Sequence, residues 1–249
     1  MTDTHPPELI RTRALLHEVM ALVTASMDRI EAGRQDITLK PDGSPVTAAD
    51  RLVEALVTAH LRTRLPGLAM AGEESFVPGQ PFPATGYRAV LDPIDGTENF
   101  CSGLMEWGLS LSLWQGDRHL GSLLWMPELG AHLMTGDRIR PLHSRIRGFS
   151  SSISDDILQG MAETRESRVM GCAVYNLYNV ARGAFARFTN PRGAQAWDLL
   201  AGLMLAREHG CEIDVDGEPY DGAFLEPGRT YRVDIRHRYD LHPGQGPLG

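Results

Sequence analysis

Apolar residues recur at helical spacing in two stretches near the start of the chain. In residues 8–32 and 48–65 they fall on one face of a 3.6-residue repeat, which predicts two amphipathic helices. Pro66 and Gly67 end the second helix. The connecting stretch at 40–47, Lys-Pro-Asp-Gly-Ser-Pro-Val-Thr, is typical of a loop because it combines Asp-Gly with two prolines.

The middle of the chain shows the patterns of β-strands. Short strands are predicted at residues 68–71 and 87–91, and the segment between them, 76–86, is rich in proline and glycine and reads as a loop excursion. Three further strands with short turns between them predict an antiparallel meander: 108–114, 119–126 and 131–135.

The second half of the chain alternates between short strands and helices. Arginine and serine are frequent at 137–152, which we predict to be a boundary between an N-terminal α+β lobe (residues 1–145) and a C-terminal α/β lobe (residues 146–249). A hairpin turning at Asp216 and Gly217 is expected near the end, before a loose tail. The pattern before this hairpin predicts a strand, a helix, a strand and a helix, in this order: 168–170, 172–182, 184–188 and 198–209.

Composition and charge exclude several classes of protein. The 249 residues are 42% hydrophobic and 22% charged, as in ordinary globular proteins. The net charge of −8 disfavours nucleic acid or an anionic membrane as a partner. The polar N-terminus predicts no signal peptide, and no apolar run has the length of a membrane span. Three widely spaced cysteines without a C-x-x-C motif fit a reducing compartment, so we expect a cytoplasmic protein.

Acidic residues mark the ends of several predicted elements. Asp50 lies three residues after Thr47 at the start of a helix, Glu73 follows a strand, and Asp198 begins a helix. Taken singly, each has an ordinary explanation, as a helix cap or a surface acid. Taken together, their positions would let the loops direct their oxygens toward one point.

The stretch LDPIDGTENF at residues 91–100 is harder to explain structurally. Asp92 and Asp95 lie three residues apart around a proline at the end of a strand, where a turn requires only one such residue. Grouped carboxylates suit Mg²⁺, and the nine histidines show no zinc-binding spacing. Two magnesium ions about 4 Å apart can clamp a phosphoryl group. The amides following Gly96 and Thr97 would hold a phosphate, so the residues indicate metal-assisted phosphate-ester hydrolysis.

Other chemistries find little support in the sequence. The chain has no G-x-S-x-G elbow, no P-loop and no G-x-G-x-x-G after a strand. Cys101 and Cys172 are either reactive thiols or buried, inert ones. Lys40 is the one lysine among many arginines. Either this position needs a compact ammonium group, or the lysine has been retained there by chance.

The acidic motifs together resemble the inositol monophosphatase family of Mg²⁺-dependent, Li⁺-sensitive phosphatases. The resemblance rests on four motifs in order: K-P-D-G-S-P-V-T-A-A-D (40–50), G-E-E-S (72–75), D-P-I-D-G-T-E-N-F (92–100) and W-D-L-L-A-G (197–202). It implies an α+β protein with the layered αβαβα sugar-phosphatase fold in two lobes, two or three Mg²⁺ ions as cofactors, and a homodimer.

The resemblance also implies which residues hold the metals. Glu73, Asp92 and the Ile94 carbonyl would bind the first ion. Asp92, Asp95 and Asp198 would bind the second, and the C-terminal lobe would supply Asp198 and the substrate contacts.

The remaining roles implied by the resemblance concern catalysis. Glu73 and Thr97 would position and deprotonate the attacking water. Asp50 would orient Thr97 through a hydrogen bond, and the amides of Gly96 and Thr97 would bind the phosphate.

The chain departs from the family pattern where substrates are recognised. Ser102 stands where many inositol-acting members have histidine in N-F-x-H-G. Gly171, Cys172 and Ala173 occupy the element expected to contact the substrate ring. Arg192 is either a contact for a second anionic group or a solvated surface residue.

The resulting functional hypothesis is a Mg²⁺-dependent phosphomonoesterase for a small polyol or sugar phosphate, with myo-inositol 1-phosphate as the default substrate. Histidinol phosphate is an alternative, because S-G-x-x-x-W-G at 102–108 resembles histidinol phosphatases. A nucleoside 3′,5′-bisphosphate or an intermediate of a specialised biosynthetic pathway is also open. A non-catalytic phosphate-binding relative is disfavoured, since grouped carboxylates without a cation cost stability.

Overall fold

The computed structural model describes residues 6–41 and 43–238. The first predicted helix is wrong in its continuity: α1 (Pro7–Thr24) ends and α2 (Met27–Ala32) begins after a turn. At this turn the Ser26 hydroxyl donates to the Leu22 carbonyl at 3.1 Å, a local bond that competes with helical geometry. The second predicted helix is confirmed as α3 (Ala48–Arg64).

The proline-rich stretch predicted as a loop forms a small hairpin. β1 (Ile37–Leu39) pairs antiparallel with β2 (Pro45–Thr47), and the Lys40 amide donates to the Ser44 carbonyl at 2.8 Å across the turn. The prediction of a loop at 40–47 is therefore corrected for its last three residues, which pair as a strand.

A five-stranded sheet forms the centre of the first half of the chain. Its order is β3-β4-β5-β6-β7; β3 and β4 are parallel, and the other neighbours are antiparallel, which confirms the predicted meander. β4 continues four residues beyond its predicted end, with a register shift between Asp92 and Asp95. The strands are β3 (Ala69–Gly72), β4 (Tyr87–Asp95), β5 (Gly108–Gln115), β6 (Arg118–Met126) and β7 (Ala131–Met134).

A six-stranded mixed sheet forms in the second half of the chain. Its order is β12-β11-β13-β10-β8-β9, and the predicted hairpin turn is confirmed by positive φ angles at Asp216 (55°) and Gly217 (88°). β8 lies within the predicted boundary segment, and β13 was not predicted. The strands are β8 (Arg147–Phe149), β9 (Ser167–Val169), β10 (Arg187–Ala194), β11 (Glu212–Val215), β12 (Glu218–Pro219) and β13 (Tyr231–Arg236).

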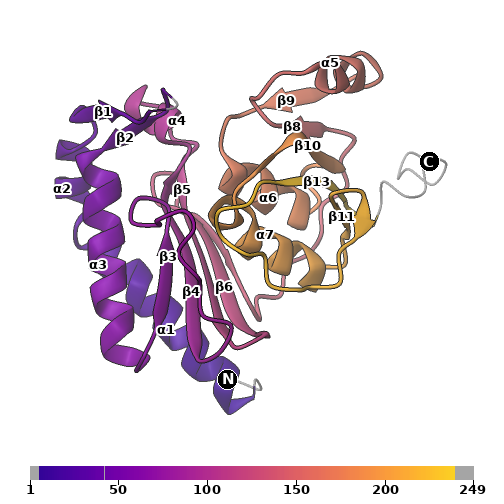
Figure 1. The fold of residues 1–249 in the computed structure, drawn as a ribbon. Helices are drawn as coiled ribbons and strands as arrows, with labels where there is room; N and C mark the ends of the chain where they lie inside the picture. Colours follow the sequence, from indigo (N-terminus) through magenta and orange to yellow (C-terminus); the bar gives the residue numbers. More distant parts are fainter. Residues whose placement is uncertain (1–5, 42, 239–249) are drawn as a thin grey trace.

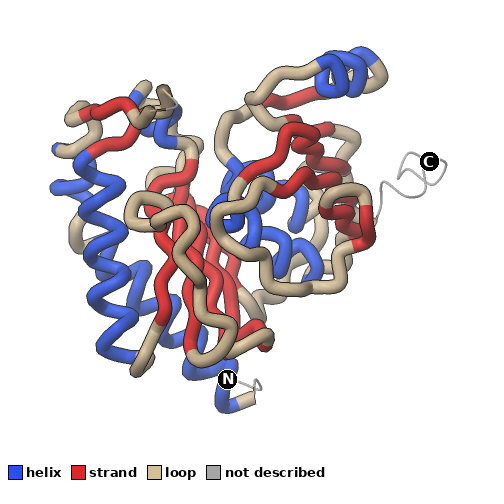
Figure 2. The backbone as a smooth tube through the Cα atoms, in the orientation of Figure 1, coloured by secondary structure: helices blue, strands red, loops and turns tan. Residues whose placement is uncertain are grey.

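Helices and sheets alternate in five layers (Figures 1 and 2). α1 and α3 cover one face of the five-stranded sheet, and α6 (Ala173–Ala181) and α7 (Ala196–Glu208) lie between the two sheets. α5 (Asp155–Ala162) lies beyond the six-stranded sheet. This is the expected αβαβα arrangement of an α+β protein. No helix in the described part of the chain is both long enough and apolar enough to cross a membrane.

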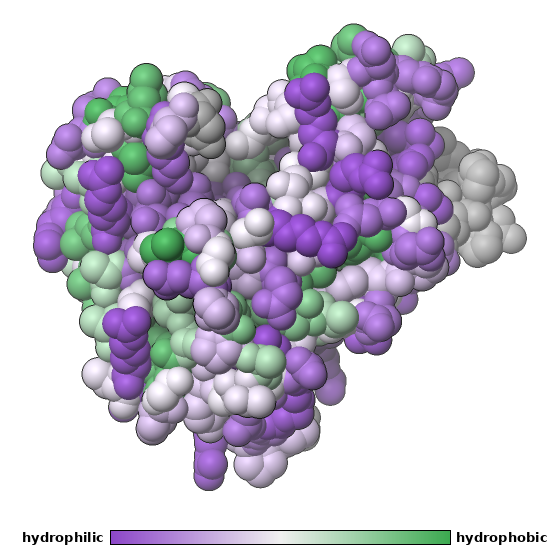
Figure 3. Space-filling model, viewed as in Figure 1, coloured by the Kyte–Doolittle hydropathy of each residue, from purple (hydrophilic) through white to green (hydrophobic). Residues whose placement is uncertain are grey.

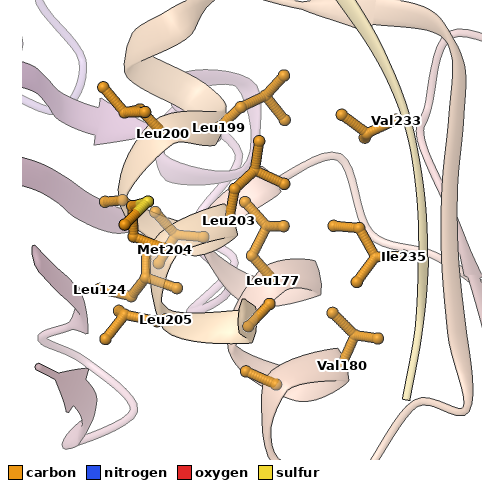
Figure 4. Packing of buried hydrophobic residues seen from close by; sticks show 14 of the residues in the cluster. Leu124, Leu177, Val180, Leu199, Leu200, Leu203, Met204, Leu205, Val233 and Ile235 are labelled. Atoms are coloured by element: carbon orange, nitrogen blue, oxygen red, sulfur yellow. The ribbon is translucent and has the colours of Figure 1, made fainter. Parts of the chain in front are cut away.

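The central helices are apolar on all sides because both sheets pack against them. Figure 4 shows Leu203 of α7 facing β13, where Val233 and Ile235 lie, whereas Met204 faces Leu124 of β6. A helix in a middle layer has no solvated face, which explains why α7 shows no amphipathic stripe. Since α6 and α7 contact both sheets, the division at residue 145 into two lobes stays a prediction.

The α6–α7 contact yields a stability prediction at Gly202. A Cβ atom at Gly202 would lie 2.6 Å from Leu177 Cβ, far inside van der Waals contact. Helix propensity alone would make Gly202→Ala stabilising by about 1 kcal/mol. We expect the clash to dominate and the variant to lose roughly 1–3 kcal/mol in urea denaturation. A variant as stable as the parent would contradict the close packing.

Candidate active site

The ends of β3 and β4 place three acidic residues at one edge of the five-stranded sheet. Because these strands are parallel, the residues following them emerge side by side, and the Glu73 amide donates to the Leu91 carbonyl at 3.1 Å. Asp92 lies within the last residues of β4, 1% exposed, and accepts a hydrogen bond from the Ile94 amide at 3.1 Å. The register shift then brings Asp95 to the same end of the strand.

The N-terminus of α7 brings in a fourth acid from more than 100 residues away. Asp198 is the third residue of this helix, and one of its oxygens accepts from the Gln195 amide at 2.7 Å. The Ser110 hydroxyl of β5 donates to the Trp197 carbonyl at 2.8 Å and ties the helix start to the sheet. One carboxylate oxygen each of Glu73, Asp92 and Asp198 lies within 4.8 Å of the others.

The N-terminus of α6 holds Asp95. The Cys172 thiol donates to Asp95 Oδ2 at 3.0 Å, and the Val174 amide donates to the same oxygen. Amides at a helix N-terminus stabilise an anion. Burial raises the pKa of the Cys172 thiol well above its usual value, so the thiol stays protonated and acts as a donor rather than a reactive thiolate.

Burial and mutual repulsion raise the pKa values of the whole cluster. Burial, followed by the charge of Asp198, raises the pKa of Glu73 to about 7; burial, followed by the charge of Asp95, does the same for Asp198. Burial raises the pKa of Asp95 to about 6, and burial with the charges of Glu73 and Asp95 raises that of Asp92 well above its usual range. Such a group of oxygen donors fits a hard divalent cation, which would relieve the repulsion.

Lys40 places an ammonium group at the rim of the cluster. Its Nζ lies 2.6 Å from Glu73 Oε1 and 2.8 Å from Glu74 Oε1. Burial acts to lower the pKa of Lys40, but the two carboxylates outweigh it and raise that pKa above its usual value. Of the two readings open from the sequence, the contacts favour a need for a compact ammonium group at this position.

Asp50 has both of the roles that its position suggests. Its Oδ2 accepts from the Thr47 amide at 2.8 Å, which completes a capping box for α3. Its Oδ1 lies 3.3 Å from Thr97 Oγ1, which also lies 3.0 Å from the Ile94 carbonyl. Thr97, the first residue of α4 (Thr97–Cys101), is therefore held between two oxygen acceptors close to the acidic cluster.

Glycine is required at residue 96 for two reasons. Gly96 has a φ of 82°, and a Cβ atom there would lie 2.9 Å from Cys172 Cβ. The left-handed backbone conformation and the close approach of α6 both disfavour any side chain. The turn after β4 and the start of α6 are thus in direct contact.

A cavity of about 450 Å³ opens beside the acids, in the range of small-molecule sites. Figure 3 shows the surface hollowed between the two halves of the molecule. Asp95 and Asp198 line it, together with residues 150–152 and the predicted substrate element 171–173. Arg192 is exposed and does not belong to the lining, so its substrate role stays a prediction. None of the described lining residues is Lys, Arg or His.

Sequence reasoning missed several residues around the site. Glu54 on α3 is 5% exposed and accepts from the Glu74 amide at 2.9 Å, and a Cβ atom at Gly72 would lie 2.3 Å from its carboxyl carbon. The sequence signal that could have identified Glu54 is its position among the apolar residues on the buried face of the predicted helix. Ser150 and Asn176, which line the cavity, carried no motif; Asn176 is one of two asparagines in a helix whose other residues are apolar or aromatic.

Comparison with known proteins agrees with this geometry. The model of the inositol monophosphatase family matches residues 8–235. The chain belongs to this family. Membership identifies it as a phosphoric monoester hydrolase.

Individual relatives of this family member carry two different names. It is 35% identical to a histidinol-phosphatase of Streptomyces coelicolor, over 86% of this chain and 90% of the relative. It is 30% identical to an inositol-1-monophosphatase of Mesorhizobium japonicum, over 77% and 80%. The solved IMPase of Thermotoga maritima superposes with a TM-score of 0.74 at 23% identity, covering 95% and 94% of the two chains, and so shares the fold.

Removing one charge from the acidic cluster should stabilise the cation-free protein. Because the pKa of Asp198 is raised to about 7 in the folded state, stability in EDTA should fall as pH rises from about 4 to about 7. Below this window Asp198 is protonated in both the folded and the unfolded state, so its charge costs nothing. Above the window Asp198 is charged in both states, and folding bears the full free-energy cost of burying that charge beside the other acids. Asp198→Asn should therefore raise Tm at pH 8 in EDTA, by roughly 2–4 °C for each kcal/mol of repulsion relieved.

The same variant should lose most of the Tm increase that Mg²⁺ gives the parent protein, measured by differential scanning fluorimetry. Glu31→Gln, at an exposed acid of α2, serves as the control and should leave both Tm values unchanged. The interpretation of the cluster as a cation site would be contradicted if Asp198→Asn had a lower Tm than the parent in EDTA, or if Mg²⁺ raised its Tm as much as it raises that of the parent.

Proposed function

We propose that this protein is a Mg²⁺-dependent phosphomonoesterase that hydrolyses a small phosphate ester, with myo-inositol 1-phosphate as the default substrate. The observation that carries the proposal is the convergence of Glu73, Asp92 and Asp198 within 4.8 Å, beside a small-molecule cavity that Asp198 lines together with Asp95. Carboxylates at this separation are suited to share cations, and those cations would bind a phosphate that enters the cavity.

The same residues divide into two metal sites. Glu73, Asp92 and the Ile94 carbonyl would hold one Mg²⁺, and Asp92, Asp95 and Asp198 would hold a second; the cofactor requirement is two or three ions. When bound, Mg²⁺ neutralises phosphate charge and lowers the pKa of a coordinated water. Asp92, which is 1% exposed, is suited to belong to both sites because the charges of Glu73, Asp95 and Asp198 all act on it.

Protein side chains would then orient the attacking water and take its proton. Thr97 Oγ1 lies within hydrogen-bond distance of the Ile94 carbonyl and of Asp50 and donates its one proton to either of them, so its lone pairs can accept from a water molecule and orient it. Glu73, a carboxylate of the same cluster, would accept the proton of that water. The amides of Gly96 and Thr97 would hold the phosphate as charge develops on its oxygens.

The cavity lining favours a substrate with a single phosphate. A second phosphate group would need a cation to balance it, and the described lining offers only neutral polar groups besides the two aspartates. This disfavours a nucleoside 3′,5′-bisphosphate and supports a neutral, hydroxyl-bearing organic group. Gly171 and Ala173 are suited to let such a group approach the backbone closely.

Histidinol phosphate is the second candidate substrate. The specific observation in its favour is the 35% identity to the Streptomyces coelicolor histidinol-phosphatase over most of both chains. We also keep the predictions of a homodimer and of a cytoplasmic location.

Thr97 provides a test of the catalytic assignment. Thr97→Ala should lower kcat with Mg²⁺ by roughly 10²–10⁴, because the group that orients the water is lost. Thr97→Ser keeps the hydroxyl and should stay within about tenfold of the parent.

Asp95→Asn should abolish turnover while circular dichroism shows an intact fold. Full activity in Asp95→Asn would overturn the metal assignment.

A substrate panel separates the remaining candidates. We expect kcat/KM to be highest for myo-inositol 1-phosphate and lower for histidinol phosphate. It should be lowest for adenosine 3′,5′-bisphosphate and fructose 1,6-bisphosphate, because the described cavity lining has no cationic side chain to balance their second phosphate. Phosphate release with Mg²⁺ is the measurement. A preference for histidinol phosphate would establish the second candidate, and no hydrolysis of any ester would favour a non-catalytic binding protein.

A further inference from the structure

Two buried polar side chains in the cavity wall have an oxygen atom without a partner; a third such oxygen belongs to Gln195, which is only half-buried. Ser150 is 8% exposed and Asn176 2% exposed, and neither Ser150 Oγ nor Asn176 Oδ1 has a hydrogen-bond partner among the described residues. Both residues line the cavity that contains Asp95 and Asp198. They come from separate elements: Ser150 follows β8, and Asn176 lies in α6.

Unpartnered buried oxygens are unusual and call for a ligand. Native proteins pair about 90% or more of such groups, and each one left unpaired costs about 1–3 kcal/mol. A neighbouring amide shows the contrast: Asn190 also lines the cavity, but its Oδ1 accepts from the Gly193 amide at 2.9 Å and so holds a loop. Ser150 Oγ and Asn176 Oδ1, in contrast, make no such hydrogen bond within the described part of the protein.

The position of Asn176 relative to the acids matches the dimensions of a small phosphate ester. Cys172, which donates to Asp95, lies one helical turn before Asn176, and the Asn176 amide donates to the Cys172 carbonyl at 3.2 Å. One turn advances about 5–6 Å along the helix. A ligand whose phosphate lies near Asp95 would therefore present its far side to this turn of α6.

We propose that Ser150 and Asn176 form a subsite that binds a hydroxyl group of the substrate's organic part and thereby determines specificity. The proposal rests on the proposed phosphomonoesterase function. The amide oxygen of Asn176 accepts from a substrate hydroxyl, and the Ser150 hydroxyl donates to or accepts from the same or a neighbouring one. Both groups are uncharged, so the subsite suits a neutral polyhydroxy group better than an ammonium group or a second phosphate.

The test compares esters with and without hydroxyl groups. Ser150→Ala and Asn176→Leu should each lower kcat/KM for myo-inositol 1-phosphate about tenfold, the loss of one net hydrogen bond, through a higher KM. Turnover of p-nitrophenyl phosphate, which has no hydroxyl, should change less than twofold. Because the deleted oxygens have no internal partner, Tm without ligand should not fall.

Asn179→Ala is the matched control, because Asn179 lies in the same helix but outside the described lining. It should leave the ratio of kcat/KM for the two esters unchanged. Equal losses for both esters, no loss for either, or a lower Tm with an unchanged ratio would overturn the subsite.

A binding experiment separates this proposal from the proposed function. Titration calorimetry with myo-inositol 1-phosphate in Ca²⁺ measures affinity without relying on turnover. If the parent hydrolyses neither ester, the proposed function fails, but an affinity about tenfold weaker in the two variants, and unchanged in Asn179→Ala, still supports the subsite. Equal affinities in all four proteins, or no binding to the parent, would overturn it.

Discussion

Repulsion among buried carboxylates is the constraint around which this molecule is built. Glu73, Asp92, Asp95 and Asp198 converge on one edge of a sheet, where burial and mutual charge raise all four pKa values. Left alone, such a group would separate or protonate. The chain holds it in place with backbone amides, since those of Ile94, Val174 and Gln195 each donate to one of the acids.

Packing around the acids prevents them from moving apart. α7 lies between the two sheets and is apolar on every side, so Asp198 at its N-terminus cannot shift without disturbing both layers. Ser110 ties the start of that helix to β5, and Glu54 fixes the Glu74 amide beside Lys40. The site is therefore preorganised: the free energy of folding holds the like charges together, and a bound cation would then relieve their repulsion.

Much of the site could be predicted because its acids follow local rules. Glu73 and Asp92 lie at the ends of adjacent parallel strands, and Asp50 and Asp198 lie in the first turns of helices, so position along each element indicated a common point. The break in the first helix, at Ser26, came from a side chain that bonds to its own backbone, which apolar periodicity does not record. β8 and β13 were missed because both pair with distant β10, and short strands held by such pairing carry little local pattern.

Substrate recognition was less predictable for a physical reason of its own. An asparagine in a largely apolar helix has the same sequence pattern whether its side chain is paired internally, as that of Asn179 is with the Tyr175 carbonyl, or has an unpaired oxygen, as Asn176 does. Only the surrounding structure distinguishes the two cases. The fold nevertheless couples Asn176 to the metal cluster. α6 holds Asp95 with its first amides and with Cys172, contacts Gly96 so closely that no side chain fits there, and carries Asn176 one turn later. Any shift of this helix would therefore alter phosphate position and specificity together, so changes of substrate within this architecture are better made by exchanging side chains along α6 than by moving it.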